Sequence, residues 1–201
     1  AALGLVAVFP GMVHALLKAD SAPVLTSGGV ASVPSPPVPR LQMEVPGWRD
    51  GSSIPTRFVR CHSGIEPESS ETGDNRSPEI RWEAPPEGTQ SLLLSLIDLE
   101  APEWEEDINQ PGVEIGDTVP RLERLVWAQL VSADALGLEE DAASAYQGPC
   151  PPWNDALEHS FLYRVQALDI ETLDIPSQLQ TLDDLTRGHI LAEGGWLGRL
   201  D

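Results

Sequence analysis

The chain of 201 residues is 41% apolar and contains six tryptophans, which is enough apolar material for one folded domain with a sizeable core. Its formal net charge is −20, with 32 acidic residues against 12 basic ones. A surface of that sign repels phosphate backbones and anionic lipid, so nucleic acid and charged membrane surfaces are excluded as expected partners.

The first 40 residues differ in composition from the rest. The apolar run from Leu3 to Leu17 is too short for a membrane span and is interrupted by Pro10 and Gly11. We predict a helical segment followed by a Pro/Gly/Ser-rich linker over residues 1–40, and a functional domain over 41–201. The apolar segment is expected to pack on that domain or on a second copy, which would give a homodimer.

The chain has two cysteines, Cys61 and Cys150, which lie far apart in the sequence. Two cysteines do not form the dense disulfide framework of a small secreted domain. No basic residue precedes Leu3, as one would in a secretory signal, so we expect a cytoplasmic protein. The prediction is therefore two buried free thiols.

From residue 41 onward, short apolar segments alternate with turn residues, as in an antiparallel β protein. The clearest predicted strands are Ser91–Asp98, Arg124–Ser132 and Phe161–Asp169. A short helix is expected over residues 181–187, with Thr181 as its N-cap and a glycine directly after its end. Asn154 and Asp155 are interpreted as turn residues.

The sequence contains no P-loop, GxGxxG, HExxH or GxSxG motif, so the common nucleotide-binding and hydrolase signatures are missing. The acidic residues Glu103, Glu105, Glu106 and Asp107 lack the ligand spacing and turn glycine of a calcium loop. We interpret them as part of a solvated acidic insertion over residues 103–123, and we expect no metal and no cofactor.

Five motifs, in this order along the chain, carry a family resemblance. They are DGSSIP at 50–55, NRSPEIRW at 75–82, SLIDLEAP at 95–102, YQGPCPP at 146–152 and GHILAEGGWLGRL at 188–200. Together they resemble the phosphatidylethanolamine-binding protein family, and especially its bacterial Raf-kinase-inhibitor-like branch. The resemblance implies a mainly β fold, an antiparallel β-sandwich with Greek-key character and a few short helices. It also implies a small anion-binding pocket, and it makes the last motif the family's final helix and strand.

The resemblance also implies where the pocket lies. In the family it is lined by an aspartate of a DPDxP motif, a strand histidine, a GPxxP loop and a following histidine. The matching positions are Asp98, Gly148, Pro149 and His159. An imidazole and a carboxylate at strand ends can form a coupled pair beside a bound ligand.

Several pocket positions depart from the family pattern. The strand histidine is replaced by Val126 or Trp127, depending on the register, and Phe161 stands where tyrosine is usual. Fewer hydrogen-bond donors favour an uncharged or aromatic ligand over an anion. The insertion 103–123 replaces a short loop and should rebuild the rim of the pocket. The predicted ligand-binding residues are Asp98, Glu100, Val126, Trp127, Gly148, Pro149, His159 and Phe161.

Three functions are consistent with this sequence. We favour a protein that binds a small molecule, because no nucleophile with an adjacent base is visible. The alternative is an isomerase, cyclase or hydrolase of a biosynthetic pathway, with His159 and Asp98 as a proton-transfer pair. Regulation of a kinase is third, because it depends on analogy with the family alone.

Overall fold

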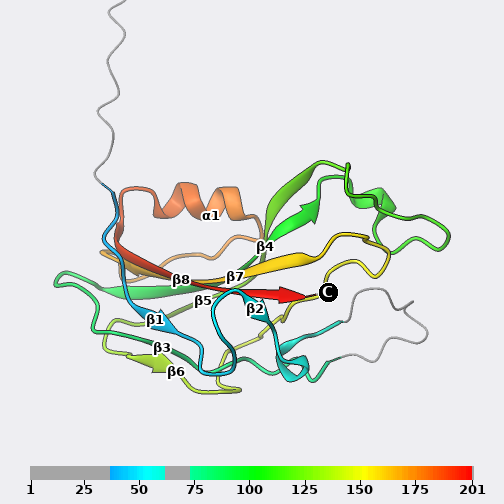
Figure 1. The fold of residues 1–201 in the computed structure, drawn as a ribbon. Coiled ribbons are helices and arrows are strands. Elements are labelled where there is room, and N and C mark those ends of the chain that lie inside the picture. The colour runs from blue at the N-terminus through cyan, green and yellow to red at the C-terminus, as the bar shows by residue number, and fades with distance from the viewer. Residues whose placement is uncertain (1–36, 62–72, 201) are drawn as a thin grey trace, which may run out of the picture. The chain divides into compact units, whose positions relative to one another are not determined.

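Two β-sheets form the framework of the described chain, residues 37–61 and 73–200 of a computed structural model (Figure 1). The larger sheet contains, in spatial order, β2 (Ser52–Ser53), β8 (Ile190–Leu200), β7 (His159–Leu168), β4 (Ser91–Pro102) and β5 (Arg121–Ser132). The smaller contains β1 (Met43–Glu44), β3 (Ile80–Trp82) and β6 (Gly137–Leu138). The described residues also form α1 (Leu179–Thr186) and the 3₁₀ helices η1 (Thr56–Phe58) and η2 (Glu105–Asp107). The predicted N-terminal helical segment lies outside the described residues.

Strand β4 occupies the middle of the larger sheet, with antiparallel neighbours β5 and β7. Its run of leucines is continuous because both of its faces are covered. Leu92, Leu94 and Leu96 point into the main core, whereas Leu93 points to the opposite face. All three predicted strands are confirmed, and β4 and β5 extend further along the chain than predicted.

The main core combines side chains from both sheets. Leu96, Phe161 and Tyr163 of the larger sheet belong to the same buried cluster as Ile80 and Trp82 of the smaller one. Each fully buried side chain of this kind stabilises the fold by about 1.5–3 kcal/mol. The mainly β class is confirmed, while the Greek-key sandwich implied by the family resemblance stays a prediction.

Helix α1 covers part of the other face of the larger sheet (Figure 1). Its buried Leu182 packs with Leu93 and Leu168 of the sheet. The helix begins two residues before the predicted cap, after Gln178, which makes no side-chain capping bond. Gly188 follows its end at a φ of 85°, as predicted. No helix among the described residues is long and apolar enough to cross a bilayer.

The prediction of two free thiols is wrong, because Cys61 and Cys150 form a disulfide with their Cα atoms 4.4 Å apart. Backbone contacts bring the two segments together: the N–H groups of Arg60 and Cys61 both donate to the Pro149 carbonyl, at 2.9 and 3.2 Å. The prediction assumed a reducing compartment and could not detect this long-range approach.

Candidate functional site

A β-bulge in the β4–β5 pair shapes the candidate site. Leu96 pairs with Trp127 and Ile97 with Leu125, which leaves Val126 as an extra residue in β5. A bulge bends its strand and changes the direction of its side chains. Trp127 turns into the core, where its Nε1 donates to a backbone carbonyl at 3.0 Å, while Val126 lines a cavity. Of the two positions considered for the missing histidine, Val126 is the one at the cavity.

The cavity beside this bulge has a volume of about 260 Å³. Its apolar lining includes Leu125, Val126, Phe161 and Ile108, and its polar lining includes Asp98, Arg60, Arg124, Asn109 and Gln147. Asp98 is the buried charged group of this wall, with 6% of its surface exposed. Hollows of about 360 and 420 Å³ on the two sheets contain no buried carboxylate. A buried charge at a mixed polar and apolar cavity is typical of a small-molecule site.

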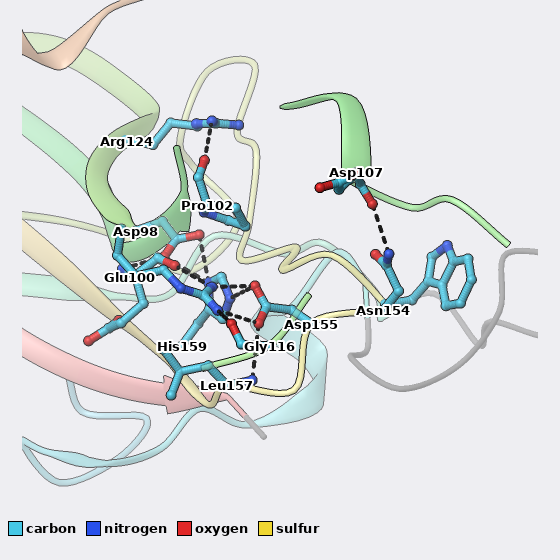
Figure 2. Close-up of polar contacts among 12 residues, drawn as sticks. Asp98, Glu100, Pro102, Asp107, Gly116, Arg124, Asn154, Asp155, Leu157 and His159 are labelled. Carbon is cyan, nitrogen blue, oxygen red and sulfur yellow. Dashed lines mark hydrogen bonds and ion pairs between the residues drawn. The ribbon is translucent and has the colours of Figure 1, made fainter. Parts of the chain in front are cut away.

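Behind Asp98, alternating charges extend away from the cavity (Figure 2). Nδ1 of His159 lies 2.9 Å from both carboxylate oxygens of Asp98, and its Nε2 lies 3.1 Å from Oδ2 of Asp155. Arg121 binds Asp155 with two guanidinium nitrogens, one of them at 3.0 Å. The side chains of His159 and Asp155 are fully buried. Each charge in this series therefore has a partner of opposite sign.

This arrangement favours the imidazolium form of His159. Burial disfavours the charged ring, but the hydrogen bonds and charges of Asp98 and Asp155 outweigh it and raise the pKa of His159. Burial likewise opposes ionisation of Asp155, yet the hydrogen bonds from Arg121 and from the Leu157 N–H lower the pKa of its carboxyl. A protonated ring can donate to both carboxylates at once.

Asp98, Val126 and Phe161 come together at the cavity, whereas five other predicted site residues lie away from its wall. Glu100 accepts a backbone N–H of β7 at 2.6 Å, and Trp127 is part of the core. A Cβ at Gly148 would lie 2.6 Å from a backbone oxygen, so this glycine allows close chain packing. Pro149 accepts the two N–H groups next to the disulfide, and His159 lies behind Asp98. Asp98 thus lies between His159 and the cavity.

Two arginines at the cavity were missed by the sequence analysis. Arg124 precedes the bulge, and its Nη2 donates to the Pro102 carbonyl at 3.1 Å and lies 3.3 Å from Glu105. Arg60 donates to Oε1 of Gln147 at 2.7 Å. Arg124 lies two residues before Val126 on one strand, and residues at this spacing normally share a face of the sheet. The bulge at Val126 interrupts that alternation, so the spacing alone could not place Arg124 at the cavity.

Metal ligation is a separate question from ligand binding. Within residues 37–61 and 73–200, no group of three or more His, Cys, Asp or Glu side chains is arranged to hold a metal ion. Glu105 and Asp107 lie in η2, with Glu105 exposed and directed at Arg124. The carboxylates at the cavity bind arginine or histidine instead.

Comparison with known proteins gives one consistent family. The family model for phosphatidylethanolamine-binding protein matches residues 46–200. A UPF0098 protein of Aquifex aeolicus is 31% identical, covering 63% of this chain and 74% of that protein. UPF0098 protein YbhB of Escherichia coli is 28% identical over 63% of this chain and 77% of its own length. The crystal structure of Escherichia coli YbcL, titled a member of the mammalian PEBP family, superposes with a TM-score of 0.59. It has 20% identity over 81% of this chain and 98% of that one.

Proposed function

Because this chain belongs to the phosphatidylethanolamine-binding protein family, we propose that it binds a small molecule in the cavity between Asp98 and Val126. The observation that carries the proposal is the buried carboxylate of Asp98 at a cavity whose other walls are partly apolar. A buried charge is costly to maintain, and the imidazolium of His159 offsets that cost from behind. One face of Asp98 is left at the cavity.

We propose an uncharged or aromatic ligand for this cavity. Val126 places an aliphatic side chain where the family has an imidazole, and Phe161 lies behind the same lining. The charged residues that line the cavity are Arg60, Arg124 and Asp98, and each already has a partner: Gln147 for Arg60, Glu105 for Arg124 and His159 for Asp98. Arginines that are already paired, beside a carboxylate, attract a multivalent anion less than free arginines would.

The enzyme alternative has no support from this geometry. A proton-transfer residue must come within hydrogen-bonding reach of the substrate. His159 is completely buried, and both of its ring nitrogens are engaged by carboxylates. Asp98 alone at the cavity is sufficient for binding and orienting a ligand.

Two further proposals concern the cellular compartment of the protein and its self-association. The Cys61–Cys150 disulfide supports an oxidising compartment over the cytoplasmic location predicted from the sequence. The apolar run from Leu3 to Leu17 supports a homodimer or a contact with a second apolar surface. Both are independent of the ligand proposal.

Native mass spectrometry of the purified protein tests the ligand proposal. We expect a bound small molecule that dissociates on gentle activation. In the variant Val126→Trp, a larger side chain at this half-buried lining position should fill the cavity and abolish the adduct. An adduct retained by Val126→Trp would place the ligand elsewhere and contradict the proposal.

A further inference from the structure

The insertion after β4 is fastened to the loop before β7 by one buried side chain. Oδ1 of Asn154 accepts the N–H of Asn109 at 2.8 Å. Its Nδ2 donates to the Asp107 carbonyl at 2.8 Å (Figure 2) and to the Val113 carbonyl at 2.9 Å. Asn154 is 7% exposed, so these bonds form largely out of water. All three partners belong to the insertion.

Backbone bonds and a guanidinium extend this attachment. The N–H of Ile115 donates to the Asn154 carbonyl at 2.9 Å, and its own carbonyl accepts the N–H of Ala156 at 3.0 Å. Nη2 of Arg121 donates to the Gly116 carbonyl at 3.0 Å. Residues 107–116 are therefore held at several points, and Ile108 and the exposed Asn109 of this segment form one wall of the cavity.

The orientation of the Asn109 amide follows from its partners. Its Oδ1 accepts the backbone N–H of Trp153 at 2.9 Å. A backbone N–H can only donate, so the oxygen must point to Trp153 and the Nδ2 to the other side. Within the part of the chain that the structure describes, this Nδ2 has no protein acceptor. Its backbone φ of 57° is one that asparagine tolerates.

The cavity lining contains a second side-chain amide whose oxygen is already in use. Gln147 uses its Oε1 for Arg60, which leaves its Nε2 as a second neutral donor. The oxygens of Asp98 accept from His159 and, at 3.0 Å, from the Glu100 N–H, and the carboxylate keeps acceptor capacity at the cavity. A ligand pairs with these two amide donors through acceptor atoms of its own, because an unpaired donor that loses water on binding is costly.

We propose that Asn109 is a specificity-determining residue, whose Nδ2 donates to an oxygen acceptor, such as a carbonyl, on an uncharged ligand with an apolar body. This inference rests on the proposed function of the cavity. Ile108 and Val126 contact the body of the ligand, while Asn154 positions Asn109. Ligands without an acceptor at that point bind more weakly, since the amide then loses its water without replacement.

The test uses two uncharged probes of nearly equal shape, acetophenone, which has a carbonyl oxygen, and ethylbenzene, which does not. The full-length ¹⁵N-labelled protein is titrated with each probe, and the amide shifts of Val126 and Phe161 report occupancy. In Asn109→Asp the carboxylate still accepts the Trp153 N–H, so the local fold is kept while the donor is lost. The matched control is Gln110→Glu, the same charge change at the next residue, which is exposed and does not line the cavity.

We expect acetophenone to bind the wild-type protein more tightly than ethylbenzene does, and to lose about fivefold in affinity in Asn109→Asp, the equivalent of one hydrogen bond. Ethylbenzene affinity should be the same in both proteins, and Gln110→Glu should change neither. Equal affinities of acetophenone for wild type and Asn109→Asp would overturn this inference and leave the cavity proposal standing. If neither probe shifts Val126 and Phe161 in the wild type, the cavity proposal itself fails.

Discussion

Removing the disulfide should destabilise the protein strongly. The bond joins residues 89 positions apart, so it closes a long loop in the unfolded chain. In the chain-entropy model such a loop costs the unfolded state about 15 cal/mol/K, or about 4.6 kcal/mol at 25 °C, and native disulfides typically contribute about 2–5 kcal/mol. We therefore expect the variant Cys61→Ser/Cys150→Ser to lose about 4 kcal/mol of unfolding free energy. For a domain of this size that corresponds to a fall of about 10 °C in Tm.

Urea unfolding followed by tryptophan fluorescence measures this loss, because Trp48, Trp82 and Trp127 all pack in or against the main core. Dithiothreitol should shift the wild-type curve to that of the double variant and leave the double variant itself unchanged. The denatured, unreduced protein should also show no titratable thiol. A double variant within about 1 kcal/mol of the wild type, or two reactive thiols in unreduced protein, would refute the reasoning.

Four further outcomes follow from the site and from the sequence. Because the pKa of His159 is raised, its contribution to stability is complete below about pH 6.5 and is lost as pH rises through its folded pKa. His159→Gln should abolish that slope in urea titrations run from pH 5.5 to 9, and an unchanged slope would contradict this. Asn154→Asp keeps the acceptor for the Asn109 N–H but loses both donated hydrogen bonds, so amide hydrogen exchange of residues 107–113 should accelerate. Unchanged protection from exchange would show that contacts other than those of Asn154 hold the insertion in place. Inorganic phosphate should bind weakly, since Arg60 and Arg124 are already paired and Asp98 lies in the same lining, and calorimetry giving micromolar affinity would contradict that. Deleting residues 1–18 should dissociate a dimer or increase the binding of an apolar dye. Unchanged sedimentation and dye binding would contradict the proposal that the apolar run packs on the domain or on a second copy.

The sequence predicted the β framework well because its signal is local. In β7 the alternation of Phe161 and Tyr163 with Leu162 and Arg164 reflects one face in the core and one face outside it. The apolar run of β4 likewise predicted a strand, and the structure shows that this strand is buried on both faces. The helix was predicted with its C-terminal glycine but not its start, because Gln178 carries no capping signal.

The cavity wall was harder to predict because it depends on long-range contacts. The bulge at Val126 changes which side chains of β5 face the cavity, and no local pattern marks it. Arg60 reaches the cavity because its backbone binds Pro149, 89 positions away. Asn154 and Asp155 read as turn residues, yet they are buried and bind the insertion, Arg121 and His159. Turn composition describes the backbone and carries no information on such distant partners.

The most direct measurement of the central claim is a crystal structure of the protein with the small molecule that co-purifies with it. We expect electron density for that molecule beside Asp98, in contact with Val126 and Phe161 and with an oxygen facing Nδ2 of Asn109. Density in the hollow at Arg40 and Arg164 instead, with the Asp98 cavity holding only water, would contradict it.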